Sequence, residues 1–507
     1  MAFNPVERRL VSLCNYWQTF HEDASKRLLV WQVPDNAIRL LQCFFEVQKH
    51  ETEYSTGDLF IVFDAPFENS IQYSRSLKEA LAGQYDASCE DLQKQGITPD
   101  WRFTPQDFPD SATGFVRSLV SFFSAHQNTI NHLAAVLMPS SVTSDDAFVA
   151  WIKRSLDSGF PETLRFVVLD TVESPRLSAL TGSKHPLVYV DSPPLDGLTT
   201  AQETFAQEPT FGPAGVFRNY LMGLVTLVEK GSAEQVQAKA ADALAFARKE
   251  QWADQEVVIA MIVAGAFLKE KKFEKAIDGY QKARLSASIA AETGHPAGQQ
   301  LILQTWFGEA SAHLAAGNPA QAAVCYDQAA IVAQQIPNLI LAIEAFRMGV
   351  FCHARLNNRD AAIERGSHAM TLGEQLEPDA RAMSTLPIAA VDLLRVIEPE
   401  RVKRMEEIKH RKDKQEDKVR QAAEQRAAEI ERKGNTQQLH MVEHDLAAAT
   451  EHAGRIAAQE LKAVTDGAGG LFSQIFAKAR SLLGEQWPLG SPIALPRVPV
   501  PSGASST

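Results

Sequence analysis

The sequence has no long hydrophobic run and few cysteines, and these absences exclude several classes of protein. No window approaches the ~20 consecutive apolar residues that a membrane-spanning helix needs, and no such run follows the N-terminal residues as it would in a secretion signal. The cysteines are scattered without a CxxC spacing, so neither a disulfide framework nor a cysteine-based zinc site is indicated (Cys14, Cys43, Cys89, Cys325, Cys352). We expect a cytoplasmic protein with reduced, buried thiols.

An excess of positive charge is also missing. The chain has 507 residues, which suggests about three domains, and its net charge is −12. This sign is opposite to that of proteins that neutralise nucleic-acid phosphates. The content of 45% hydrophobic and 22% charged residues is typical of a globular protein, and we expect no nucleic-acid partner.

The common catalytic motifs are absent. The sequence contains no GxxxxGK[ST], GxGxxG, GxSxG or HExxH, and Thr181-Gly182-Ser183-Lys184 has the wrong order for a phosphate loop. His132 precedes an apolar run and stands alone, so we interpret it as a surface or core histidine. His313 and His353 are interpreted as packing imidazoles within helix pairs. We therefore expect no cofactor, no metal and no enzymatic activity.

The first two hundred residues alternate short apolar runs with helical patterns. Near-continuous apolar strands between helices predict a mostly parallel sheet covered on both faces. The expected strands are Leu28–Val33, Leu59–Phe63, Leu133–Met138, Phe166–Leu169 and Leu187–Val190. The expected helices are Pro5–Phe20, Ala37–Lys49, Asn69–Leu81 or beyond, Ser111–Gln127 and Asp145–Ser158. This predicts an α/β domain over residues 1–195, including the leading helix.

Three of the expected strands end in aspartate, namely Asp64, Asp170 and Asp191. Ligands of such folds gather at the carboxyl ends of the strands, so these carboxylates could serve an α/β enzyme if they converge. A regulatory protein with a degenerate nucleotide-hydrolase-like domain is a second possibility. Aspartates after strands are also common turn and cap residues, and no glycine follows the first strand to let backbone amides approach a phosphate.

Residues 196–215 are rich in proline and glycine, which marks an inter-domain connection. Beyond it, one arrangement of small residues occurs three times between about Ala260 and Ala369. The copies are Ala264, Ala276, Ala283; Ala310, Ala322, Ala329; and Val350, Ala362, Ala369. Small residues let the axes of two helices approach closely, and stacked helix pairs bury a continuous core. We therefore expect helical repeats with capping helices over residues 216–396.

This pattern resembles the tetratricopeptide repeat family. Trp306 and Phe346 occupy the early aromatic position of that family, and Tyr280 and Tyr326 follow the middle alanine of their copies. The period of 46 and then 40 residues exceeds the usual ~34, as in a variety with long helices. The resemblance implies a groove, lined by the first helices of the pairs, that holds an extended or helical peptide of another protein.

Aligning the signature alanines places several side chains in that groove. They are Val258, Met261 and Lys269; Gln304, Phe307, Ser311 and Leu314; and Glu344, Arg347, Phe351 and Arg355. Phe307 and Phe351 would be apolar anchors. Lys269, Arg347 and Arg355 would favour an acidic segment or a C-terminal carboxylate. The alternative is that these charges only keep the helices soluble.

The C-terminal region contains two long helices and a short amphipathic one. Within residues 397–466, Arg401–Lys433 is densely charged with interleaved signs and reads as a solvated helix, and Thr436–Val464 is alanine-rich. Within residues 467–507, Leu471–Trp487 has one apolar face that could dock in the chain's own groove, on another protein or on a membrane surface. We expect Pro488–Thr507 to be disordered.

These patterns together predict a non-enzymatic, protein-binding adaptor or chaperone of bacterial type. The repeats would hold a partner, and a secretion-system loading factor is one such role. The alternatives are the regulatory protein and the α/β enzyme named above. Neither the oligomeric state nor the partner follows from the sequence.

Overall fold

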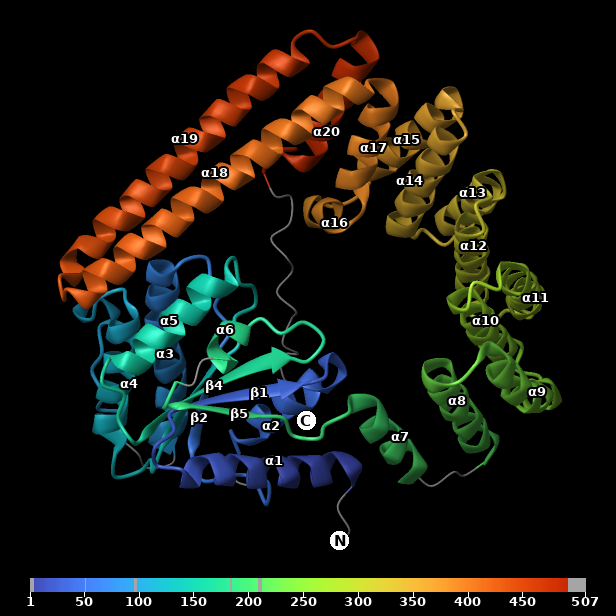
Figure 1. The fold of residues 1–507 in the computed structure, drawn as a ribbon. Helices are drawn as coiled ribbons and strands as arrows, with labels where there is room; N and C mark the ends of the chain where they lie inside the picture. The colour runs from blue at the N-terminus through green and yellow to red at the C-terminus, as the bar shows by residue number, and fades with distance from the viewer. Residues whose placement is uncertain (1–3, 51, 95–97, 183–184, 208–211, 491–507) are drawn as a thin grey trace. The chain divides into compact units, whose positions relative to one another are not determined.

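The computed structural model describes residues 4–50, 52–94, 98–182, 185–207 and 212–490. The described chain forms two compact units. One contains the N-terminal residues up to 207 together with residues 414–452, and the other contains residues 212–413 and 453–490. The predicted fold class is confirmed: a parallel α/β domain, an all-α repeat region and long C-terminal helices (Figure 1).

The α/β domain is built on a five-stranded parallel sheet with the order β2-β3-β4-β1-β5. The strands are β1 Leu28–Val33, β2 Leu59–Phe63, β3 Leu133–Leu137, β4 Leu164–Thr171 and β5 Val188–Asp191. Each lies within two residues of its predicted bounds. The apolar runs were readable because strands buried on both faces carry little polar alternation.

Helices cover both faces of the sheet. Leu29, Trp31 and Val33 of β1 pack with α1 (Pro5–Glu22) and α2 (Ile38–Val47), because alternate side chains of a strand point to the same face. Leu28 and Val30 point the other way, into a core formed with α3 to α6. Those helices are α3 Ser70–Lys94, α4 Ala112–His126, α5 Asp145–Asp157 and α6 Ser178–Thr181. A capping box between Asn4 and Glu7 begins α1, and Ser111 and Ser144 cap α4 and α5.

The stretch predicted as a connection, residues 196–215, does contain the boundary between the two units but is not irregular throughout. Helix α7 (Gly197–Gln207) lies within it and packs against α1 and α2. Asp196 caps this helix by accepting from the backbone amides of Leu198 and Thr199. The proline and glycine residues of this stretch hid the helix in the sequence.

The repeat region consists of antiparallel helix pairs in series (Figure 1). They are α8 Gly212–Lys230 with α9 Ala233–Lys249, α10 Ala253–Lys269 with α11 Phe273–Glu292, α12 Gly298–Ala315 with α13 Pro319–Gln335, and α14 Leu339–Arg355 with α15 Arg359–Gly373. All nine signature positions are buried, at most 1% exposed. Contact is close: a Cβ atom added at Gly308 would lie 2.3 Å from Cε1 of Tyr280.

The last repeat is covered by helices that come later in the chain. α16 (Pro378–Met383) and α17 (Leu386–Ile397) follow α15, and α20 (Gly470–Leu483) packs on α15, α16 and α17. Phe472, Ile475, Phe476 and Ala479 are buried there. The amphipathic segment thus packs on the chain itself, but on α15 and the capping helices and not along the first helices of the pairs, where the predicted groove lies.

The two long helices are α18 (Pro399–Arg432) and α19 (Leu439–Thr465), joined through the turn at Gly434. Residues 414–452, which we call the hairpin tip, belong to the unit of the α/β domain. Leu489 is 5% exposed against the core at α20, so the predicted disordered tail does not begin at Pro488. The rest of that tail, residues 491–507, lies outside the described residues.

Candidate functional site

The predicted groove positions of α12 lie on one face of that helix. Gln304 and Ser311 are exposed, and Phe307 is half-buried with its ring 5.8 Å from that of Tyr326 on α13. Burial raises the pKa of Tyr326 to about 12, although a hydrogen bond with Ser311 acts in the opposite direction. Phe307 therefore offers only one side of its ring to a partner.

The corresponding face of α14 holds the most accessible of these side chains. Phe351 is 41% exposed, and the guanidinium carbon of Arg355 lies 5.5 Å from the centre of its ring. Arg355 is exposed too, and no carboxylate of the described chain lies within ion-pair distance of it. An aromatic surface with a cation beside it offers apolar contact and charge in one place.

Arg347, one turn earlier on α14, does not face a partner freely. Its guanidinium donates two hydrogen bonds to Glu344, of 2.7 and 2.6 Å, and lies 3.7 Å from Asp392 of α17. Asp392 also binds Arg395, which in turn pairs with Glu406 of α18. Burial raises the pKa of Asp392, while Arg395 and Arg347 act in the opposite direction. The structure thus places Arg347 in an internal chain of alternating charges.

Lys269 ends α10 and is exposed, with its ammonium 3.0 Å from the carbonyl oxygen of Val228 on α8. A pocket of ≈ 570 Å³ lies at the same, early end of the repeats. Its lining includes Phe217, Arg218, Leu221, Trp252, Asp254 and His295. Phe307 and Phe351 do not line this pocket, so the groove residues are not gathered in one cavity.

The strand-end aspartates are not brought together. β2 and β5 are the two edges of the sheet, so Asp64, directly after β2, and Asp191, the last residue of β5, belong to strands four spacings apart, or ~19 Å. Asp170 is 2% exposed and its carboxylate accepts hydrogen bonds from the backbone amides of Thr171, Arg176 and Leu177. Asp170 therefore fixes its own loop, and the three carboxylates do not form one catalytic site.

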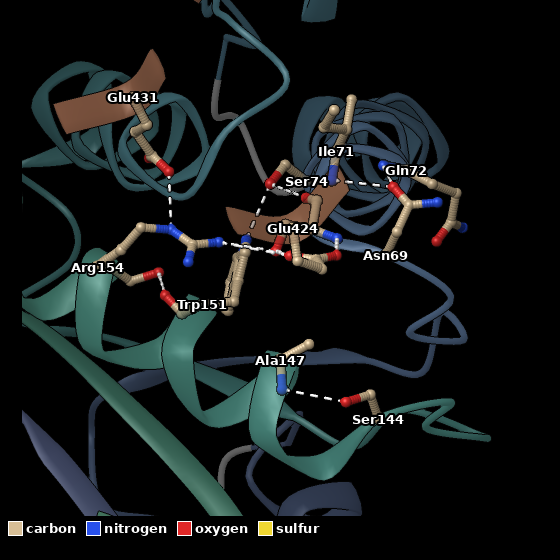
Figure 2. A network of polar contacts seen from close by, with 12 residues as sticks. Asn69, Ile71, Gln72, Ser74, Ser144, Ala147, Trp151, Arg154, Glu424 and Glu431 are labelled. Carbon is tan, nitrogen blue, oxygen red and sulfur yellow. Dashed lines mark hydrogen bonds and ion pairs between the residues drawn. The ribbon is translucent and has the colours of Figure 1, made fainter. Parts of the chain in front are cut away.

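The hairpin tip approaches the α/β domain at the N-terminal end of α3 (Figure 2) and also at that of α4. Glu424 accepts from the backbone amide of Ser70, the first residue of α3, at 2.7 Å, and also from its hydroxyl. Glu431 accepts from the amide of Thr113, in the first turn of α4, at 2.8 Å. Amides at helix N-termini lack partners within the helix and favour negative charge, so both glutamates act as caps supplied from a distant segment.

Arg154 of α5 lies between the two glutamates (Figure 2). Its Nε donates to Glu431 at 2.9 Å, and its Nη2 donates to the Ser70 hydroxyl at 2.7 Å and lies 4.0 Å from Glu424. The two glutamate side chains are only 12% and 7% exposed, and that of Arg154 is 18% exposed. Partly buried charges of this kind are stable only with their partners in place.

An apolar seam and a second arginine complete this contact. Ile71 of α3 is buried together with residues of both hairpin helices, namely Ala427, Ile430, Leu439 and Val442. Arg75 of α3 pairs with Glu443 of α19 and, at 2.9 Å, with Asp110. Asp110 also pairs with the ammonium of Lys78, whose side chain is 1% exposed. The hairpin tip is thus an integral part of the α/β unit.

The sequence analysis did not find this contact. The charged helix was interpreted as solvated, and for Glu424 and Glu431 that interpretation is wrong. One signal was present: Glu424, Ala427 and Glu431 are spaced three and four residues apart and share one helix face. The spacing cannot identify the surface that the face meets, because Ser70 lies 354 residues earlier.

No protein-family model matches the chain, and no match is found among curated proteins. Solved structures give matches of low similarity. BtubC from P. vanneervenii is 14% identical, with 54% of this chain and 89% of that chain covered and a TM-score of 0.30. A Rap protein complexed with competence and sporulation factor is 11% identical, with 88% and 99% covered and a TM-score of 0.26.

A third match is a signal transduction ATPase with numerous domains and a tetratricopeptide repeat sensor, from Pyrococcus horikoshii. It is 9% identical, with 94% of each chain covered and a TM-score of 0.22. Scores this low carry no conclusion about function for the present chain. Within the described residues, no helix is long and apolar enough to cross a membrane.

Proposed function

We propose that this chain is a non-enzymatic, protein-binding adaptor that holds a partner on the first helices of a tetratricopeptide-like array. The carrying observation is the exposed pair on α14: Phe351 is 41% exposed and Arg355 lies against its ring with no described carboxylate beside it. Burying the exposed part of this ring against a partner would remove apolar surface from water, which is favourable. Ser311 and the open side of Phe307 extend the same face onto the preceding pair.

The partner expected from this chemistry is a peptide or helix that carries an apolar side chain next to an acidic group or a C-terminal carboxylate. Arg347 contributes little, because Glu344 and Asp392 already balance its charge. We further propose a cytoplasmic, bacterial setting, in which loading a component of a secretion system is one role for such an adaptor.

The proposed absence of enzymatic activity is supported by the groups at the carboxyl edge of the sheet. Backbone amides there, which could bind a phosphate, donate instead to the chain's own carboxylates. Glu173 accepts from the amide of Asp35 after β1 at 3.0 Å, and Glu424 and Glu431 accept from α3 and α4. A nucleotide would have to displace these carboxylates, which disfavours the alternative of a working nucleotide-dependent regulator.

The test is affinity purification from the native cell with a matched pair of variants. Phe351→Ala/Arg355→Glu removes the anchor and reverses the charge on α14. The control, Leu285→Ala/Lys282→Glu, makes the same kind of change on α11, where Leu285 is 69% exposed. We expect a protein that is retained by the intact chain and the control and lost by the α14 variant.

Equal retention by both folded variants would reject the α14 surface. Equilibrium dialysis with ATP and GTP tests the proposal that the α/β domain has no working nucleotide site, and we expect no saturable binding. Nucleotide binding that is strengthened by Glu431→Ala would instead favour the regulatory alternative, because that substitution frees the amide of Thr113 in the first turn of α4.

A further inference from the structure

Three potential metal ligands meet at the amino edge of the sheet, away from the groove and from the hairpin tip. Asp58 and His132 immediately precede β2 and β3, and Leu59 pairs in register with Leu133. The amide of Leu59 donates to the carbonyl of His132, so the two residues occupy neighbouring positions on adjacent strands. Phe60, two residues after Asp58, belongs to the core under α1, so Asp58 points toward that helix.

The third ligand comes from the last turn of α1. His21 follows Trp17 by four residues and shares its helix face. The Trp17 ring lies 4.7 Å from that of Phe60, which fixes this face against the sheet, and its indole nitrogen donates to Asp58 Oδ2 at 2.7 Å. The imidazoles of His21 and His132 stand edge to face with ring centres 4.1 Å apart.

The spacing of the ligand atoms fits a single ion. His132 Nδ1 lies 3.3 Å from Asp58 Oδ1, and His21 Nδ1 lies 3.8 Å from Asp58 Oδ2. One ligand atom from each of the three side chains lies within 4.8 Å of the other two. Ligands bound to zinc at ~2.0–2.2 Å in a tetrahedron are ~3.4 Å apart, so small side-chain rotations bring all three into range.

The polar groups here are otherwise poorly satisfied. The Asp58 side chain is 9% exposed, and its contacts are Trp17 and the two histidines. The nearby Arg165 guanidinium of β4 donates to the carbonyls of Glu162 and Leu164 rather than to Asp58. His21 Nδ1 is buried and has no hydrogen-bond partner. A buried carboxylate to which no fixed cation donates directly, next to an unpartnered imidazole nitrogen, is an unfavourable arrangement unless a cation joins them.

We propose that His21, Asp58 and His132 bind one divalent transition-metal ion of the zinc type, which ties the end of α1 to the amino ends of β2 and β3. Two imidazole nitrogens exclude Mg²⁺ and Ca²⁺, which prefer oxygen ligands. The hydrogen bond from Trp17 orients the carboxylate, as partners of metal ligands commonly do. The histidine side chains are 19% and 29% exposed, so water can reach a fourth position.

A second cluster in the repeats, Glu309, His313 and Cys325, is a weaker candidate. Glu309 already accepts hydrogen bonds from Arg284 and from Gln281, so its charge is balanced. Burial raises the pKa of Cys325 to about 12, which keeps the thiol in its non-ligating, protonated form. This cluster serves as the competing location in the experiment.

The test is calorimetric titration of the chelator-treated full chain with Zn²⁺, together with visible absorption after adding Co²⁺. We expect one site per chain and Co²⁺ bands typical of four or five ligands. His21→Ala/His132→Ala is expected to abolish both signals, and Asp58→Asn to weaken binding on the order of 100-fold. Trp17→Phe, which removes the hydrogen bond to Asp58 and keeps an aromatic ring in this buried position, is expected to weaken it about 10-fold.

His444→Ala, on the exposed surface of α19, is the control for loss of any histidine and is expected to bind as the intact chain does. Circular dichroism without metal shows whether each variant is folded. If the double variant is unfolded, the metal affinity of Asp58→Asn and the Co²⁺ spectrum of the intact chain test the assignment instead. Zinc binding that is lost with His313→Ala but kept in His21→Ala/His132→Ala overturns the assignment. So does an intact, folded chain that binds no Zn²⁺.

Discussion

Helix α20 and the hairpin tip both come from the C-terminal part of the chain, and each packs against residues far earlier in the sequence. Their chemistry differs. α20 buries Phe472, Ile475 and Phe476 in the core of the last repeat, whereas the hairpin tip places Glu424 and Glu431 on helix N-termini around a small apolar seam. The first contact depends on removing apolar surface from water, and the second depends mainly on directed charges.

Composition predicts the burial of an apolar helix face better than the burial of a charged one. An apolar helix face predicts that the face is buried, but it does not identify the surface that covers it. A charged face carries no such sign, because interleaved acidic and basic residues also suit a solvated helix. The two contacts should therefore respond differently to substitution and to salt.

The largest effect is expected from Phe472→Ala on α20. Its side chain is fully buried, and removing a buried phenylalanine costs about 3–5 kcal/mol. Denaturant unfolding and hydrogen exchange of α17 and α20 measure this, and the loss should be the same at low and high salt. Leu471→Ala, at a side chain 42% exposed, is the control, with a change of about 0.5 kcal/mol or less. A strong salt dependence would contradict an apolar contact.

The next effect is expected from Glu431→Ala in the hairpin tip. The substitution removes the acceptor of the Thr113 amide and of Arg154 Nε, at a cost of about 2–3 kcal/mol. Hydrogen exchange of residues 414–452 should accelerate while that of α20 stays unchanged. Glu429→Ala, two residues earlier on the exposed face and paired with Lys433, should have little effect. Equal effects of the two substitutions would show that the directed charges are not what holds the tip.

A smaller effect separates the outer part of the same contact. Arg75 and Glu443 are 37% and 30% exposed, so their coupling in a double-mutant cycle should be about 1 kcal/mol and should fall as salt rises. Stability of Arg75→Ala, Glu443→Ala and the double variant gives this value. A coupling that salt does not change would place the pair in a drier environment than its exposure indicates.

The smallest effect is expected within the hairpin itself. Arg426 and Asp445 join α18 to α19 across 2.6 Å, but their side chains are 49% and 57% exposed. Such pairs contribute about 0.5 kcal/mol or less. Thermal unfolding of Arg426→Ala should therefore match that of the intact chain closely. A loss as large as that of Glu431→Ala would remove the distinction between capping and surface charges.

Much of the fold followed from local patterns. Leu28–Val33 and Leu59–Phe63 have the predicted bounds, and the alanine spacing located the helix pairs, because burial and close approach act on residues near one another in the sequence. Helix α7 was missed because Pro and Gly surround it. The pairing of Arg347 with Glu344, three residues earlier, could have been read from the helix spacing, but its contact with Asp392 could not, because Asp392 comes from a helix that the repeat pattern does not include.

The candidate metal ligands show the same limit. His132 was interpreted as isolated because its nearest candidate partners in the sequence lie far away. Asp58 and His132 each precede a predicted strand by one residue, which was a usable signal. The two residues can be recognised as neighbours only when β2 and β3 are known to be adjacent, and the order of strands in the sheet does not follow from the sequence pattern.

The long-range caps also impose an order in time. The α/β domain up to residue 207 is synthesised first, and residues 209–413 follow before the hairpin tip exists. At ~5–20 residues per second, roughly 10–40 s pass between the two. During that interval Ile71 is uncovered, Arg154 lacks both glutamates, and the amides of Ser70 and Thr113 donate to water. For this interval the nascent chain therefore exposes a partly apolar, basic surface that is buried in the finished protein. A ribosome-associated chaperone could bind the chain at this surface.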